Sequence, residues 1–322
     1  MDSSKKEEGR MKKEDLPEGK SSRRSFLKGL SIAAAAGSAS LATGCSLKSL
    51  PATSEEFSLK WEEYFKKNYR LMTQQEKDET VARLTRLAKL HDNLDLTISA
   101  QEPREKVLFG YAFNITRCEG FMDCVEACVQ ENNLDRTSKT QYIRVFEMEP
   151  GKLDPSTGDG KYFHQVPVAD KFYMGVQCFH CENAPCIKAC PIKATWREPD
   201  GIVVVDYDWC IGCRYCMAAC PYWGRRFNWG KPHVPKEEIT RQQHYLGNRQ
   251  RMKGAMEKCT FCIQRTRQGK LPACVEACPT GARVFGNLLD PDSEIRFVLK
   301  NKKVFRLKEE LGTDPKFWYF ID

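Results

Sequence analysis

Hydrophobic residues recur at helical spacing in the segment that precedes nearly all of the cysteines. Two stripes lie within residues 51–108, the first made of Trp61, Tyr64, Phe65 and Tyr69 and the second of Val81, Leu84, Leu87 and Leu90. Thr73 and Glu76 stand between them at the spacing of a capping box, in which each side chain satisfies a free amide of the first helical turn. The pattern predicts two amphipathic helices. We expect them to pack on the domain that follows, with docking onto a partner protein as the alternative.

A second hydrophobic pattern marks the beginning of the chain. The stretch 29–41 is built mainly of Ala, Ser and Gly, and it is too short and too weakly apolar to span a membrane. Directly before it lies Ser22-Arg23-Arg24-Ser25-Phe26-Leu27-Lys28, which resembles the twin-arginine export signal S-R-R-x-F-L-K at every position. We therefore predict export by the twin-arginine route, to the periplasm or the outer face of the cytoplasmic membrane. A disordered basic tail is the alternative interpretation.

The first cysteine of the chain is a candidate for a lipid anchor. The segment Leu41-Ala42-Thr43-Gly44-Cys45 resembles a lipoprotein box, in which small residues precede the modified cysteine. The alternatives to lipidation of Cys45 are an incidental cysteine in a segment that is removed, or an uncleaved anchor. A single acyl chain binds membranes only marginally. A lipid-anchored form would therefore need a second contact, for which we expect a partner protein.

Composition and charge narrow the class of protein further. The 322 residues include 51 basic and 43 acidic ones, of which nine and six fall in residues 1–44, so the remainder is only mildly basic. That charge argues against a nucleic-acid partner, and a hydrophobic fraction of 41% is adequate for a globular core. We divide the chain into a signal segment (1–44), a linker with a helical extension (45–108) and a cysteine-rich domain (109–322).

Fifteen of the 16 cysteines fall between residues 118 and 278, in four runs. The clearest run is Cys210-Ile-Gly-Cys213-Arg-Tyr-Cys216-Met-Ala-Ala-Cys220-Pro221, which has the spacing C-x2-C-x2-C-x3-C-P of bacterial iron–sulfur proteins. Two further runs carry insertions in the middle gap and consist of Cys178, Cys181, Cys186 and Cys190, and of Cys259, Cys262, Cys274 and Cys278. Because all three end in C-x3-C-P, they predict ligands of iron–sulfur clusters.

The run that comes first in the chain is one cysteine short. It reads Cys118-Glu-Gly-Phe121-Met-Asp-Cys124-Val-Glu-Ala-Cys128, with Phe121 in the place of the second cysteine. Phe has no donor atom, and we expect Asp123 to point elsewhere. A cubane iron held by sulfides alone is easily lost, so this run predicts a [3Fe–4S] cluster. An empty site with free or partly disulfide-bonded cysteines is the alternative.

Two other uses of clustered cysteines fit the spacing less well. Structural zinc takes four ligands from paired C-x2-C motifs and has no need of a third and fourth cysteine followed by proline. A disulfide scaffold suits proteins outside the cytoplasm, but thiols packed this densely would scramble during oxidative folding. His180 lies inside the second run, where packing or hydrogen bonding is a better interpretation than metal ligation.

The order of the runs predicts which cysteines share a cluster. In paired clusters, the fourth cysteine of one run serves the cluster of the other run. The two middle runs are neighbours, and the gap between them, which contains residues 201–206, is expected to form a short strand pair as in a two-cluster ferredoxin. The outer runs then pair by elimination. The predicted sets are site 1 (Cys178, Cys181, Cys186, Cys220), site 2 (Cys210, Cys213, Cys216, Cys190), site 3 (Cys259, Cys262, Cys274, Cys128) and site 4 (Cys118, Cys124, Cys278).

Further residues outside the ligand sets match a known pattern. They are Tyr222, Arg225, Arg226, Phe227 and Asn228 after the third run, Lys258 before the fourth, and the closing Gly312-Thr313-Asp314-Pro315. With these, roughly residues 109–322 resemble the four-cluster iron–sulfur subunits of the polysulfide reductase and dimethyl sulfoxide reductase type. Similar parts occur in alternative complex III and in the sulfate-reduction membrane complex. The resemblance implies an α+β fold of tandem ferredoxin-like modules, behind the helical extension and the export signal.

The resemblance also implies a role as a wire between a catalytic or haem partner and a membrane quinone subunit. The sequence contains no dinucleotide fingerprint, no P-loop and no C-x-x-C-H haem motif, so we expect no catalytic site. We expect an electron-transfer subunit with three [4Fe–4S] clusters and one [3Fe–4S] cluster. Its expected partners are a membrane quinone-binding subunit and a molybdopterin or multihaem cytochrome subunit. The alternatives are a subunit dedicated to a molybdenum reductase, and a metal-free or zinc-holding structural lipoprotein.

Overall fold

The computed structural model describes residues 71–322. The twin-arginine motif, Cys45 and the first of the two predicted helices lie outside the described residues. The α-helices are α3 (Gln74–Asp92), α4 (Asp123–Glu131), α5 (Pro185–Lys188), α6 (Tyr215–Ala218), α7 (Ile263–Thr266), α8 (Ala273–Glu276) and α9 (Glu294–Asn301), and the 3-10 helices are η1 (Pro155–Thr157), η2 (Lys236–Glu238) and η3 (Glu309–Leu311). No helix in this part of the chain has both the length and the apolar character needed to cross a membrane.

The strands of the described part form one larger sheet and several short pairs. They are β1 (Thr97–Ser99), β2 (Phe109–Asn114), β3 (Arg144–Met148), β4 (Phe172–Val176), β5 (Thr195–Arg197), β6 (Val203–Val205), β7 (Arg225–Phe227), β8 (Gln242–His244), β9 (Met256–Lys258), β10 (Arg283–Asn287), β11 (Lys303–Phe305) and β12 (Phe317–Ile321). The four-stranded sheet has the order β10-β2-β12-β11, and the remaining strands pair as β1-β8, β3-β4, β5-β6 and β7-β9.

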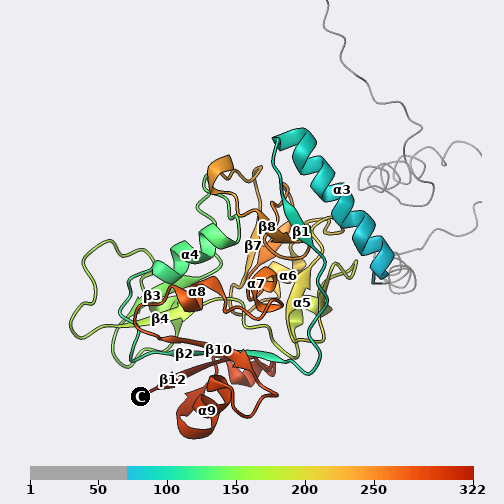
Figure 1. Cartoon of the computed structure of the whole chain (residues 1–322). Helices are drawn as coiled ribbons and strands as arrows, with labels where there is room; N and C mark the ends of the chain where they lie inside the picture. The colour runs from blue at the N-terminus through green and yellow to red at the C-terminus, as the bar shows by residue number, and fades with distance from the viewer. Residues whose placement is uncertain (1–70) are drawn as a thin grey trace, which may run out of the picture. The chain divides into compact units, whose positions relative to one another are not determined.

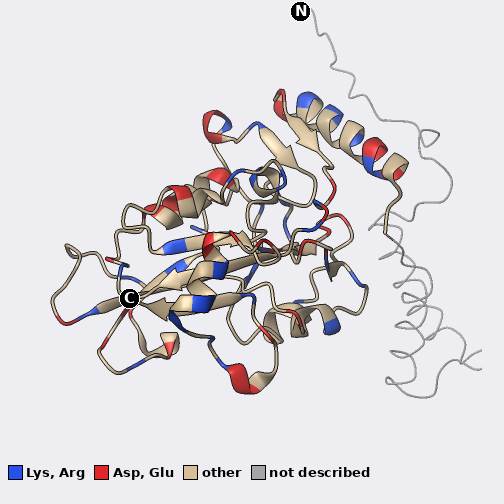
Figure 2. Cartoon of the chain, turned by 60° about the horizontal axis from the view of Figure 1, so that its bottom comes forward, with Lys and Arg blue, Asp and Glu red and all other residues tan. Residues whose placement is uncertain are grey.

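Helix α3 begins where the capping box predicts. The Thr73 hydroxyl accepts a hydrogen bond from the amide of Glu76, and the Glu76 carboxylate accepts one from the amide of Thr73 at 2.9 Å. The helix ends at Asn93, whose φ of 52° is in the left-handed region. It lies next to β1 (Figure 1) and buries none of its side chains fully. Basic and acidic side chains both line its surface (Figure 2).

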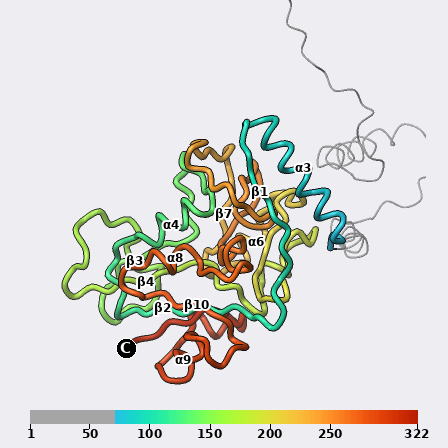
Figure 3. The backbone as a smooth tube through the Cα atoms, in the orientation of Figure 1, coloured from blue at the N-terminus to red at the C-terminus, as the bar shows by residue number. Residues whose placement is uncertain are grey.

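The four-stranded sheet brings the first and last cysteine runs together. Its strand β2 reads FGYAFN and is buried along its whole length, so it takes a central position between β10, which is antiparallel, and β12, which is parallel. Since β2 leads into the first run and β10 leads away from the last, their pairing places the two runs side by side (Figure 3). Helix α9 covers one face of the sheet through Ala112, Val284, Ile295, Val298 and Phe320.

The other face of the sheet packs against the middle runs through aromatic rings. Tyr111 stacks on Phe317 with ring centroids 4.9 Å apart, and Phe317 stacks at 4.7 Å on Phe179 of the second run. Such stacked pairs add to the free energy of burial. The sheet therefore supports the first, second and last runs.

The short strand pairs hold the loops of the middle runs. β5 and β6 are antiparallel, with Thr195 opposite Val205, which confirms the strand pair predicted there. Strand β7, which follows the third run, pairs with β9, which leads into the last run. A parallel pair of β1 and β8 was not predicted, and it ties residues 97–99 of the extension to the cysteine-rich part of the chain.

Candidate iron–sulfur cluster sites

Each cysteine run folds as a tight loop followed by a short helix, and the loop contains residues with positive φ. In the third run these are Gly212 (φ 74°) and Arg214 (φ 67°). A Cβ on Gly212 would lie 2.2 Å from the carbonyl oxygen of Gly254, so only glycine fits this turn. Helix α6 then carries Cys216, and Cys220 follows the end of the helix. This geometry aims three cysteines inward from one loop and sends the fourth toward a neighbouring site.

The four cysteines predicted for site 1 line one cavity, together with Arg225 and His180. Burial raises the pKa of the Cys181 thiol, and the thiols of Cys178, Cys186 and Cys220 raise it further. Because the four side chains line the same cavity, they are close neighbours. Cys220 comes from the third run, as the crossover rule requires.

The site 2 cysteines also lie together, with Cys190 as the crossing member. Burial raises the pKa of the Cys216 thiol to about 11, and the Arg225 guanidinium opposes this rise. The thiols of Cys210, Cys186 and Cys190 raise the pKa further. Burial likewise raises the pKa of Cys190, where Cys213 is the contributing thiol. Cys213 and Cys190 remain partly exposed.

Site 3 is the most deeply buried of the four sets. Burial raises the pKa of the Cys128 thiol well above its ordinary value, and the thiols of Cys262, Cys274 and Cys259 add to the rise. All four side chains are buried. The Asn132 amide points its Nδ2 at two of these sulfurs, 3.6 Å from Cys128 Sγ and 3.7 Å from Cys262 Sγ. Sequence reasoning missed Asn132, whose only signal is its position one turn after Cys128.

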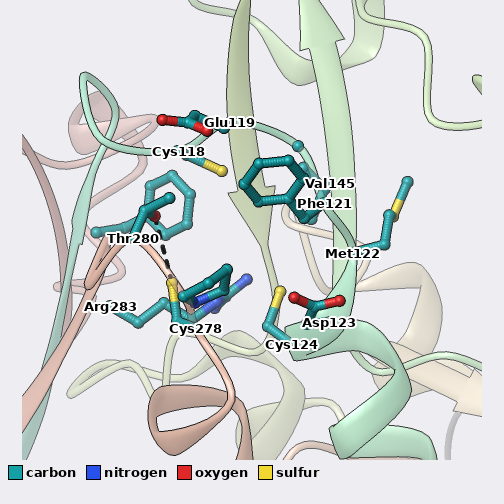
Figure 4. A pocket seen from close by; sticks show the side chains of 13 residues that line it. Cys118, Glu119, Phe121, Met122, Asp123, Cys124, Val145, Cys278, Thr280 and Arg283 are labelled. Carbon is teal, nitrogen blue, oxygen red and sulfur yellow. Dashed lines mark hydrogen bonds between the residues drawn. The ribbon is translucent and has the colours of Figure 1, made fainter. Parts of the chain in front are cut away.

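Site 4 is a cavity lined by Cys118, Cys124 and Cys278 (Figure 4). Burial raises the pKa of the Cys118 thiol to about 11, opposed by the Gly120 amide and Arg283 and supported by the other two thiols. Phe121 lines the cavity and is 43% exposed.

The expectation that Asp123 points away from site 4 is wrong. Asp123 lines the cavity and lies next to Cys124 in Figure 4. It is the first residue of α4, and the turn at Met122 (φ 71°) directs this end of the helix toward the cavity. The residues that line this site therefore include two carboxylates, Asp123 and Glu119, besides the three thiols.

The donor sets fit iron–sulfur clusters in number and in chemistry. All fifteen cysteines of the described part are free of disulfide bonds, and thiolate is the ligand that these clusters use. Crowded thiols with raised pKa values give up their protons when a cationic centre binds them. Buried guanidinium nitrogens without partners, Arg225 Nε and Nη1 and Arg283 Nη2, belong to residues that line the two cavities. No group of three or more His, Cys, Asp or Glu side chains in residues 71–322 is arranged to hold a single metal ion.

His180 serves packing and hydrogen bonding, as predicted. Its Nδ1 accepts a hydrogen bond of 2.9 Å from the amide of Val203. Its ring stacks on Phe261 with centroids 3.7 Å apart. Since Phe261 lies between Cys259 and Cys262, the stacked rings join the loop of site 1 to the loop of site 3.

Comparison with known proteins concerns the same part of the chain. Residues 169–249 and 236–288 match the model of the 4Fe-4S dicluster domain. A candidate iron–sulfur subunit of dimethyl sulfoxide reductase from Halobacterium salinarum is 41% identical over 211 residues, which cover 66% of this chain and 78% of that protein. The Hdr-like menaquinol oxidoreductase iron–sulfur subunit 1 of Archaeoglobus fulgidus is 37% identical over 248 residues (69% and 86%). A component of the polysulfide reductase of Wolinella succinogenes is 36% identical over 209 residues (65% and 91%).

These matches cover most of each relative and include the ferredoxin-like part with its mixed helices and strands. The chain therefore belongs to the family of iron–sulfur electron-transfer subunits of the dimethyl sulfoxide reductase and polysulfide reductase type.

Proposed function

We propose that sites 1, 2 and 3 each hold a [4Fe–4S] cluster, that site 4 holds a [3Fe–4S] cluster, and that the chain conducts electrons between two partner subunits. When bound, each cluster supplies a centre that takes up and releases one electron. The thiolates of the chain hold these centres, and burial keeps water away from site 3, whose four cysteines are all buried. Donors such as the Asn132 amide stabilise negative charge on the ligand sulfurs.

The observation that carries the proposal is the division of fifteen cysteines into four neighbouring sets without a remainder. In addition, one thiol of each set interacts with a thiol of the next set. The neighbouring thiols are Cys216 with Cys186, Cys259 with Cys178, and Cys128 with Cys124. These electrostatic interactions between neighbouring thiols support a linear path in the order site 2, site 1, site 3, site 4.

The two ends of this path reach the surface. Two partly exposed cysteines occur at each end, Cys190 and Cys213 at site 2 and Cys118 and Cys278 at site 4, whereas site 1 has one, Cys220, and site 3 has none. Exposed aromatic side chains accompany site 2, with Tyr215 63% and Trp229 65% exposed. Electrons therefore enter and leave at sites 2 and 4. We assign site 4 to the quinol side, because a [3Fe–4S] cluster is easier to reduce than a cubane.

We further propose that the chain works on the outer face of the cytoplasmic membrane after twin-arginine export. The proposed partners are a membrane quinone-binding subunit and a molybdopterin or multihaem cytochrome subunit. The relatives named for menaquinol oxidoreductase and polysulfide reductase support a quinone-linked complex. The second candidate, a subunit dedicated to a molybdenum reductase, is favoured by the relative named for dimethyl sulfoxide reductase. Identification of the subunits that co-purify with the chain separates the two.

Electron paramagnetic resonance of the anaerobically purified, air-oxidised chain tests the cluster assignment. A [3Fe–4S] centre is paramagnetic when oxidised, whereas ordinary [4Fe–4S] ferredoxin centres are silent, so we expect one oxidised-state signal. Phe121→Cys should remove this signal and add one iron per chain. Phe297→Cys, at an exposed position on α9, is the matched control and should change neither.

Two outcomes would contradict the assignment of site 4. An oxidised chain loaded at sites 1–3 that gives no signal would mean that site 4 holds something else or nothing. If wild-type site 4 contains four irons and Asp123→Asn converts it to three, the Asp123 carboxylate, which lines the cavity, is the missing ligand. A chain without iron or visible absorbance would refute the electron-transfer function and favour a structural lipoprotein.

The location is tested separately at the beginning of the chain. Replacing Arg23 and Arg24 by Lys should leave a cluster-loaded protein in the cytoplasm, and normal export of that variant would refute the twin-arginine route. Cys45→Ser should reduce membrane retention and remove the lipid mass if Cys45 is acylated. An unchanged mass would show that Cys45 carries no lipid.

A further inference from the structure

Buried basic side chains fall into two groups according to their partners. The buried Lys and Arg residues of the described part are Arg225, Arg249, Arg251, Lys258, Arg267 and Arg283. Half of them pair with a carboxylate: Arg249 with Asp208 (3.2 Å), Arg251 with Glu257 (3.2 Å) and Arg267 with Asp200 (3.0 Å). The other three make no ion pair with any carboxylate in residues 71–322. A buried charge without a counter-charge is costly, so these three need another negative partner.

Arg225 faces the ligands of two sites. Its Nη2 donates to Cys186 Sγ at 3.1 Å and to Thr195 Oγ1 at 2.9 Å, while Nε and Nη1 have no partner. Cys186 belongs to site 1, and Cys216 of site 2 also acts electrostatically on the guanidinium. Arg225 therefore stands at the junction of sites 1 and 2.

Lys258 holds the corresponding place between sites 1 and 3. Its Nζ donates to the carbonyl oxygens of Val203 and Cys259. The thiols that act on it belong to Cys178 and Cys186 of site 1 and to Cys259 of site 3. The backbone bonds thus hold the ammonium group between the two sets.

Arg283 completes the series between sites 3 and 4. Its Nη1 donates to Tyr111 Oη at 3.1 Å and to Gln177 Oε1 at 3.0 Å, and Nη2 has no partner. Cys124 of site 4 and Cys274 of site 3 act electrostatically on the guanidinium. The side chain lines the site 4 cavity near Cys124 and Cys278 (Figure 4). Every junction of the path therefore contains one buried cation without a carboxylate.

The position of the two arginines in the runs repeats. Arg225 and Arg283 each stand five residues after the last cysteine of a run and open the strand that follows, β7 or β10. The same position after Cys190 is Thr195, the first residue of β5, and Thr195 accepts a hydrogen bond from Arg225. Thr195 and Arg225 thus occupy equivalent positions after the two middle runs and contact each other, and only Arg225 carries a charge.

We propose that Arg225, Lys258 and Arg283 are the counter-charges of the three junctions, and that each raises the reduction potentials of both clusters beside it. The inference rests on the proposed cluster assignment. A cluster with four thiolate ligands carries net negative charge, and an added electron makes it more negative. A fixed cation in a low-dielectric junction stabilises the reduced form of both neighbours. Arg225 and Arg283 remain protonated throughout, so at their two junctions the step is the gain of one electron with no proton.

The test is potentiometry of the whole chain with its clusters, followed by electron paramagnetic resonance. Arg225→Met, Lys258→Met and Arg283→Met remove the charge and keep an unbranched stem. Each substitution should lower the reduction potentials of the two adjoining clusters by at least about 59 mV. For a one-electron couple, this shift is a tenfold decrease in the equilibrium constant of reduction. Sites 1 and 3 should each respond to two variants, whereas sites 2 and 4 should each respond to one. Arg225→Lys should stay near the wild-type potentials.

Arg214→Met is the matched control, because it removes the same charge from an exposed position next to Cys213, where solvent screens it. It should shift the site 2 potential by much less than Arg225→Met. Equal shifts in the two variants, or fully loaded variants with unchanged potentials, would overturn the proposal.

If Arg225→Met loses iron, Arg225→Lys decides the matter. Recovery of the iron by Lys supports a requirement for charge, and no recovery shows that the shape of the guanidinium matters instead, which overturns the proposal at that junction. A wild-type chain without iron would refute the proposed function. If the wild-type chain is loaded with clusters but the potentials do not change in the Met variants, only the counter-charge proposal is refuted.

Discussion

Removal of the Arg267 guanidinium should loosen the turn between β5 and β6, which lies between the second and third cysteine runs. Arg267 follows α7, and its Nε and Nη2 donate to Asp200 at 3.0 Å and to Glu198 at 2.9 Å, in the turn between β5 and β6. Asp200 is fully buried, and its carbonyl oxygen accepts a hydrogen bond of 2.9 Å from the amide of Phe109 in β2. The pair therefore connects three segments that are distant in the sequence.

The magnitude follows from what Arg267→Met leaves behind. Loss of one partner of a buried ion pair costs about 3–5 kcal/mol, because the remaining charge stays buried and uncompensated. Here Asp200 would keep only the amide of Ile202 as a donor to its carboxylate. At about 1.4 kcal/mol per tenfold, even the lower figure makes opening of the turn roughly 100-fold more frequent.

Amide hydrogen exchange of the cluster-loaded chain measures this directly. Peptides that contain the Phe109 amide and the turn 198–202 should exchange roughly 100-fold faster in Arg267→Met. Arg265→Met is the matched control, since Arg265 lies two residues earlier and pairs with Glu131 (3.2 Å) in a partly exposed site. It should cost no more than about 1 kcal/mol. Unchanged exchange of the turn in Arg267→Met would refute the reasoning.

The pH dependence of this variant has a definite sign. Burial raises the pKa of Asp200, and the Arg267 guanidinium opposes that rise. Without Arg267, the pKa of Asp200 in the folded chain lies still further above its value in the unfolded chain. Folding then favours the protonated form, so the destabilisation should grow as the pH rises. Asp200→Asn in the Arg267→Met background should recover part of the lost protection.

Three further outcomes are expected. Gly212→Ala should lower the iron content of site 2, because its Cβ would meet Gly254 O at 2.2 Å, whereas Gly230→Ala, with no atom within 4 Å, should not; equal iron in both would contradict the steric argument. Thr73→Ala should cost about 1 kcal/mol of local stability in α3, seen as faster exchange of its first-turn amides, and unchanged exchange would show that the cap is dispensable. Burial lowers the pKa of His244 to about 3, so stability should fall below pH 6.5 by about 1.4 kcal/mol per pH unit, and thermal melting of His244→Gln should show a weaker fall.

The spacing of the cysteines was sufficient to predict most of the site. A run such as Cys210–Cys220 encodes its loop and short helix locally, since the turn residues and the ligand spacing are both local properties. The capping box at Thr73 is local in the same sense, and α3 begins there. The pairing of the outer runs followed from counting ligands, because each cluster needs a fixed number of them.

Tertiary structure decided what depends on partners distant in the sequence. Arg225 and Arg251 are alike as residues, yet one is buried against Cys186 and the other against Glu257. Asp123 faces the site 4 cavity because the backbone turns at Met122, and β1 finds its parallel partner β8 nearly 150 residues away. Burial makes an uncompensated charge costly, but which side chains are buried together is known only once the strands have paired. The sequence alone therefore predicts the ligands, and the fold determined the charges that surround them.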